Sequence, residues 1–171
     1  MSNVITLHEG EPDEETLTMN NGLTDVFLGT LVLSGSLLAR REEEKRLIVW
    51  LAERDQAAVG LGMVGFDLAE LPWDSRTFEQ DRAFLLRAID GAKGKLGWEY
   101  LDWTPSEERL FPALEQFSRM VNRLRACDIQ PEALRQWLLA AGEDDPIRRG
   151  FPTCPVHHTL LTVFGCLLCH G

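Results

Sequence analysis

The residues that most constrain the fold of this chain are gathered at its C-terminal end. The final eighteen residues, CPVHHTLLTVFGCLLCHG, contain three of the four cysteines and three of the four histidines in the 171-residue sequence. Cys154 and His157 are spaced C-x2-H, and Cys166 and Cys169 are spaced C-x2-C. A two-residue gap lets the backbone form a tight knuckle that aims both side chains at one point. The two pairs together therefore predict one tetrahedral Cys3His zinc site.

The residues between the two pairs favour a short β-hairpin. Residues 159–164 (TLLTVF) are strand formers. Pro155 fixes φ inside the first knuckle, and Gly165 permits the unusual backbone angles needed at the entrance to the second. Such a hairpin brings the second knuckle back to the first. Because a closed Cys3His shell leaves no open coordination position, we expect the zinc ion to be structural rather than catalytic.

The identity of the nitrogen ligand is the least constrained part of this prediction. His157 has the better spacing and is the predicted ligand. His158 is its neighbour in sequence and His170 follows the last cysteine, so either residue is an alternative to His157.

Other uses of these cysteines fit the sequence less well. A disulfide, or haem attached through the C-x-x-C-H sequence that ends at His170, requires an exported protein. The N-terminal residues MSNVITLHEG contain no basic region followed by an apolar one, so we expect no export. A zinc deaminase requires an H-x-E sequence, and residues 154–171 contain no Asp or Glu.

Upstream of this region, apolar residues recur at helical spacing. The predicted fold is mainly α: an acidic, mobile segment over residues 1–16, in which residues 4–7 are a candidate for a brief strand, one helical domain over 17–145, and a zinc-knuckle tail with a zinc-ribbon-like β-hairpin over 146–171. Two strands are the alternative for the first helix, because Gly29 and Gly35 interrupt it. We expect helices near residues 24–41, 42–57, 74–97, 106–124 and 131–141. The predicted core contains Leu47, Leu51, Phe84, Ile89, Leu110, Leu114, Phe117, Trp137 and Leu138.

Two further motifs have both a functional and a structural interpretation. Gly60, Gly62 and Gly65 spell G-x-G-x-x-G, but a predicted helix precedes them and Pro72 opposes a helix start after them, so we interpret them as a turn. Three aromatic residues lie between Trp98 and Trp103, and we expect them to be core residues rather than a stacking site.

Composition limits the partners of the chain. Its 27 acidic and 17 basic residues give a formal net charge of −10, which argues against nucleic acid or an anionic membrane as the main partner. A basic protein partner suits this charge. The apolar stretch from Val26 to Ala39 is shorter than the ~20 residues that a membrane span needs. We therefore expect a soluble, cytoplasmic protein.

Three stretches together resemble a known group of proteins. Residues 65–73 (GFDLAELPW), residues 98–101 (WEYL) and the C-terminal CPxH and GCxxC sequences resemble small uncharacterised bacterial proteins. Some members of that group are immunity proteins that neutralise polymorphic toxins. The resemblance covers roughly residues 60–171. It implies a bacterial, cytoplasmic, non-enzymatic binder, and it carries over no catalytic residue.

Three functional hypotheses follow from these observations. An immunity protein would bind its partner through the acidic helical body, whereas a zinc-ribbon adaptor of a larger complex would use the apolar-rich tail. An enzyme is the third hypothesis, with Cys127 as the lone thiol nucleophile and no histidine near it in sequence. Because no nucleophile, base and oxyanion site emerge together, we favour a non-enzymatic protein-binding module, with toxin neutralisation as its leading form and the adaptor as the alternative.

Overall fold

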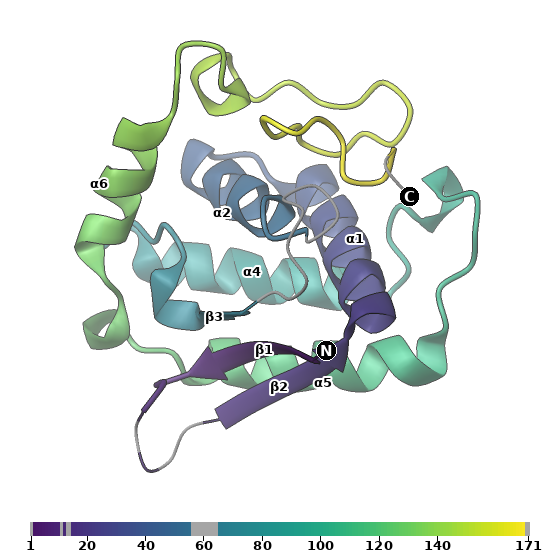
Figure 1. The fold of residues 1–171 in the computed structure, drawn as a ribbon, viewed down its shortest axis with the longest axis horizontal. Helices are drawn as coiled ribbons and strands as arrows, with labels where there is room; N and C mark the ends of the chain where they lie inside the picture. The colour runs from purple at the N-terminus through teal and green to yellow at the C-terminus, as the bar shows by residue number, and fades with distance from the viewer. Residues whose placement is uncertain (1, 11, 13–14, 56–64, 170–171) are drawn as a thin grey trace.

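Helices make up most of the computed structural model, which describes residues 2–10, 12, 15–55 and 65–169 (Figure 1). The mainly α class is therefore confirmed. Within the described residues there are five α-helices and one three-stranded sheet. The helices are α1 (Asn21–Leu38), α2 (Glu42–Ala52), α4 (Phe78–Lys93), α5 (Glu107–Arg123) and α6 (Pro131–Ala140). The strands are β1 (Ser2–Leu7), β2 (Glu15–Asn20) and β3 (Gly65–Asp67).

The N-terminal residues belong to the sheet rather than to a mobile segment, and the brief strand expected at residues 4–7 is part of the longer strand β1. Strand β1 lies at the centre of the order β2-β1-β3, antiparallel to β2 and parallel to β3. Ile5 and Leu7 of β1 are almost fully buried, as are Leu17 and Met19 of β2. The acidic residues that suggested mobility fall mostly between the two strands. Burial of alternate apolar side chains on one face explains why the flanking residues are ordered.

Helix α1 is the central element, in contact with α2, α4, α5 and the sheet. It begins at Asn21 rather than near residue 24, because the Asn20 side chain caps it by accepting a hydrogen bond from the Leu23 amide at 2.8 Å. Gly35 does not break the helix, since it is where α2 approaches closely: a Cβ there would lie 2.2 Å from Cδ1 of Ile48. Among the described helices, α1 alone is long and apolar enough to cross a membrane, and 56% of it is buried inside the protein.

The other helices differ from prediction mainly at their ends. Helix α2 ends at Ala52, whereas the predicted end was near residue 57. Helix α4 begins at Phe78, whereas the predicted start was near residue 74. The side chain of Asp74 instead binds the backbone and guanidinium of Arg76 in a local turn, which delays the helix. In the G-x-G-x-x-G stretch, Gly60 and Gly62 lie outside the described residues, and Gly65 starts β3.

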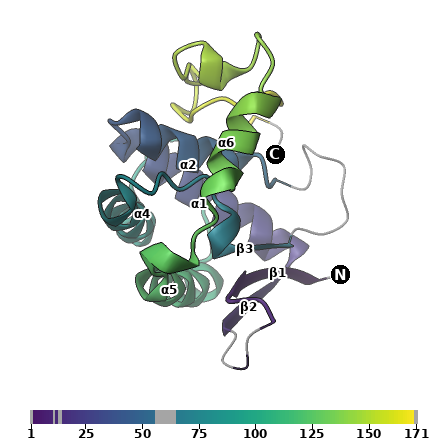
Figure 2. The ribbon, with the colours of Figure 1, turned by 90° about the vertical axis from the view of Figure 1, so that its left-hand side faces the viewer.

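The predicted core is confirmed in α2, α4 and α5 but not in α6. Seven of the nine predicted core residues are fully buried, whereas Trp137 and Leu138 of α6 are only partly buried against the core. Leu139, the next residue of α6, is 69% exposed. Helix α6 lies at the edge of the molecule, where only one side of it meets the body (Figures 1 and 2).

The aromatic residues near position 100 were expected to be core. Trp98 is partly buried and packs against Phe111, with ring centroids 6.3 Å apart, so the prediction holds there in part. Trp103 is 40% exposed, so the prediction is wrong at that position. The chain between α4 and α5 runs along the surface, which leaves no layer to cover Trp103 (Figure 1).

Candidate metal centre

The four predicted ligands meet at one point. One donor atom from each of Cys154, His157, Cys166 and Cys169 lies within 4.8 Å of the other three. The Sγ atoms of Cys154 and Cys169 are 3.7 Å apart. Nδ1 of His157 lies 3.7, 3.6 and 3.4 Å from the sulfurs of Cys154, Cys166 and Cys169. The donor atoms thus form one compact cluster. The four residues are therefore close enough to bind one metal ion.

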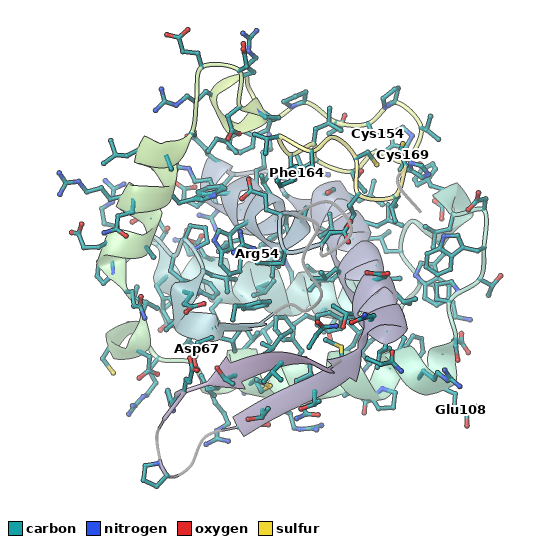
Figure 3. All side chains as sticks on the ribbon, in the orientation of Figure 1. Arg54, Asp67, Glu108, Cys154, Phe164 and Cys169 are labelled. Carbon is teal, nitrogen blue, oxygen red and sulfur yellow. The ribbon has the colours of Figure 1, made fainter. Side chains whose placement is uncertain are left out.

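No disulfide competes for these sulfur atoms. All four cysteines are free thiols, and those of Cys154 and Cys166 are buried. Figure 3 shows Cys154 and Cys169 side by side in the tail, although they are fifteen residues apart in sequence.

The first knuckle favours a thiolate at Cys154. The amide of His157 donates to its Sγ at 3.5 Å. Burial opposes ionisation of this thiol, but hydrogen bonds from the His157 and Val156 amides outweigh it and lower the Cys154 pKa to about 6. At this knuckle the two-residue gap therefore also turns a backbone amide toward the sulfur atom.

Cys169 in the second pair has the opposite electrostatics. Burial together with the neighbouring thiols of Cys154 and Cys166 raises the pKa of Cys169 to about 11. Thiolates this close together repel one another. A bound cation would remove this repulsion, because metal ligation deprotonates thiols outright.

The backbone between the pairs is a set of tight turns rather than a regular hairpin. In residues 146–169, pairing is limited to two isolated antiparallel bridges, Thr153 with Leu160 and Thr162 with Gly165. The predicted zinc-ribbon-like hairpin is not confirmed beyond these bridges. Gly165 has a φ of 89°, as its predicted role requires, and its amide donates to the Thr162 carbonyl at 2.9 Å. Val163 and Phe164 form the tip of this turn.

The alternative histidine ligands have different positions. The ring of His158 packs against Tyr100, with centroids 4.4 Å apart, and is not part of the cluster. His170 lies outside the described residues. The structure therefore supports His157 over His158 as the nitrogen donor.

Residues distant in sequence hold the metal-ligand region against the helical body. The Leu160 amide donates to Ser36 Oγ of α1 at 2.9 Å, and the Leu160 side chain joins the hydrophobic core. Leu168 packs over Gly29, where a Cβ would lie 3.2 Å from Leu168 Cδ2. Sequence reasoning missed both contacts. Gly29, which interrupts the apolar sequence of α1, was the signal that could have revealed the Leu168 contact, since a glycine often marks a site of close packing.

A polar cavity away from the metal-ligand cluster is the alternative candidate for a functional site. Its volume is about 300 Å³, and its lining includes His8, Asp67 and Asp128. His8 Nε2 lies 3.0 Å from Oδ2 of Asp128, a pairing across 120 residues that the sequence does not reveal. The exposed thiol of Cys127 is 3.9 Å from the other Asp128 oxygen. A cysteine nucleophile needs a base such as histidine beside its sulfur. Here the group beside the Cys127 sulfur is the Asp128 carboxylate, and His8 pairs with the other oxygen of that carboxylate.

Searches against protein-family models, curated proteins and solved structures found no match to this chain.

Proposed function

We propose that the chain binds one Zn2+ as a structural ion through Cys154, His157, Cys166 and Cys169. The observation that carries the proposal is the spacing of the four donors. Tetrahedral zinc, with bonds of about 2.3 Å to sulfur and about 2.0 Å to nitrogen, separates two sulfurs by about 3.8 Å and sulfur from nitrogen by about 3.5 Å. The observed separations of 3.4 to 3.7 Å agree with both values.

The donor set selects zinc and a structural role. Three thiolates and an imidazole are soft to borderline ligands, which favour zinc over magnesium or calcium. Four protein ligands fill the shell, so substrate has no position on the metal. The site needs its thiols reduced, which is consistent with the cytoplasm.

On this proposal, the ordered tail serves a non-enzymatic protein-binding module. The support is where apolar side chains are exposed. Val156 is 62% exposed, Val163 is 56% exposed and Phe164 is 41% exposed, and all three lie between the first and last metal ligands. Exposed apolar residues on a metal-ordered surface are typical of protein contacts. They favour the adaptor type of function, with the tail as the contact face and a basic protein as the partner.

Toxin neutralisation, the form that the sequence favoured, is the second candidate. It rests on the excess of 27 acidic over 17 basic residues and would place the partner on the helical body. Salt distinguishes the two: binding through charge on the body weakens steeply as salt rises, whereas binding through apolar side chains of the tail weakens less.

Elemental analysis and affinity capture test this proposal. We expect one zinc per purified chain, and none when Cys166→Ser is combined with Cys169→Ser. We also expect the zinc-loaded chain to retain a protein from its native cell that the double variant loses. A zinc ratio near zero, or unchanged zinc in the double variant, contradicts the structural site. Turnover of a small molecule with no retained protein contradicts the binding role.

A further inference from the structure

A groove of about 350 Å³ runs between the metal-held tail, the end of α2 and α6. Its apolar walls come from both sides: Trp137, Ala140 and Ala141 of α6 face Val163 and Phe164 of the tail. Figure 3 shows Phe164 and Arg54 on facing elements of this region. The groove thus joins segments that are separated by about 100 residues in the chain.

Two carboxylates lie among these apolar walls. Glu53 is only 11% exposed, and its Oε2 accepts a hydrogen bond from the Trp137 indole at 3.0 Å. Asp145 also lines the groove. Burial raises the pKa of Glu53, and the nearby charge of Asp145 raises it further, while Trp137 and Arg54 act in the opposite direction. The two carboxylates therefore repel each other across the groove.

Arg54 also lines the groove, and its guanidinium contacts an aromatic ring more closely than it contacts a carboxylate. The Arg54 guanidinium lies over the Trp50 ring, 4.1 Å from its centroid. Its Nη2 is 3.7 Å from Glu53 Oε2, a loose pairing. One guanidinium faces two carboxylates, so the groove keeps net negative charge, in a chain whose overall charge is −10.

We propose that this groove binds an arginine side chain of a protein partner. The proposal rests on the proposed function and specifies its contact. The apolar stem of an arginine fits between Phe164 and Trp137, and its planar head can pair with Glu53 and Asp145 while it stacks on an aromatic ring. A lysine has the charge but lacks the planar group.

Metal binding controls the wall formed by the tail. Val163 and Phe164 are the tip of the turn closed by Thr162 and Gly165, and Gly165 directly precedes the ligand Cys166. Loss of the ion releases that turn and opens the groove. Binding of arginine at this site therefore depends on zinc, although no atom of the ligand touches the metal.

The test uses the zinc-loaded full chain and Nα-acetyl-arginine amide as the probe. The Trp137 indole N–H signal in a ¹H–¹⁵N spectrum reports on the groove, because this group donates to Glu53. We expect a saturable shift of that signal, and a much weaker response to Nα-acetyl-citrulline amide, which has the same shape without charge. Asp145→Asn should lower the affinity by about fivefold, as one partly exposed ion pair predicts.

Matched variants separate the groove from general charge effects. Asp144→Asn removes a neighbouring carboxylate whose side chain is 94% exposed and pairs with Arg149, so it should leave the affinity unchanged. Glu53→Gln keeps an acceptor for Trp137 and should weaken binding. The double variant Cys166→Ser, Cys169→Ser, which is expected to hold no zinc, should not respond to the probe.

Several outcomes overturn the groove assignment: no shift of the Trp137 signal, equal response to arginine and citrulline, or equal effects of Asp144→Asn and Asp145→Asn. If the same sample holds one zinc and retains a protein partner, the groove is wrong and the proposed function stands. If the chain holds no zinc, the proposed function fails independently of the groove.

Discussion

The helical body and the metal-ligand tail of this protein differ in how much apolar surface they bury and in how closely they gather metal-binding side chains. In the body, side chains such as Phe27, Leu51 and Phe117 are completely buried, and the sum of their apolar burial supplies the stability. In residues 154–169, few large apolar side chains are buried and Leu160 is the main one; Val163 and Phe164 are exposed. The tail instead brings four metal ligands together. A short segment with too little apolar surface to bury can gain its order from metal ligation.

If the proposed zinc is bound, its removal is the strongest way to separate the two regions. Binding energies of about 10 to 16 kcal/mol are typical of structural zinc in short peptides, so chelation should release the tail. The body keeps its own core and should stay folded. Hydrogen exchange should show lost protection at amides such as Thr162 and Gly165, with protection kept in α4 and α5.

An unchanged exchange pattern after complete zinc removal would show that packing alone orders the tail. Cooperative unfolding of α4 and α5 would show instead that the tail is part of one folding unit with the body.

Phe117→Ala is the corresponding change in the body. Phe117 is fully buried in α5, and its ring meets Phe27 edge-on, with centroids 5.2 Å apart. Truncation of a buried phenylalanine costs about 3 to 5 kcal/mol of unfolding free energy, from lost burial and the cavity left behind. Urea denaturation measures this loss.

The native fraction of the Phe117→Ala variant should still bind one zinc, because no ligand is touched. A loss of less than about 1 kcal/mol would mean that this part of the core is not as tightly packed as the structure shows.

Ser36→Ala changes the contact between the two regions and should have the smallest effect. Ser36 Oγ accepts the amide hydrogen of Leu160 at 2.9 Å, and the variant leaves that donor without its acceptor. The cost should be about 1 to 3 kcal/mol. It should appear as faster exchange of the Leu160 amide, with the body's urea midpoint nearly unchanged.

Ser36→Thr serves as the control, because it keeps a hydroxyl group at the same position. If Ser36→Ala destabilised α4 and α5 as strongly as the tail, the sharp distinction between the two regions would be wrong.

Local pattern was enough to predict much of this protein. The four metal ligands form two pairs, and each pair is three residues apart, so a single turn of backbone fixes the geometry within the pair. The same holds for the stripe of Leu110, Leu114 and Phe117, because helical periodicity places these side chains on one face whatever the rest of the chain does.

Long-range contacts decided what the sequence left open. The N-terminal residues form strand β1 because β2 and β3 pair with it. Helix α6 packs only against the outside of the core, which side chains of the other elements fill. The hydrogen bond between Leu160 and Ser36 joins residues 124 positions apart in the chain. The groove is lined by Glu53, Trp137 and Phe164, which are also far apart in sequence. Sequence spacing carries information about neighbours within a turn or a strand, whereas contacts of this separation depend on which surfaces remain to be buried once the core has formed.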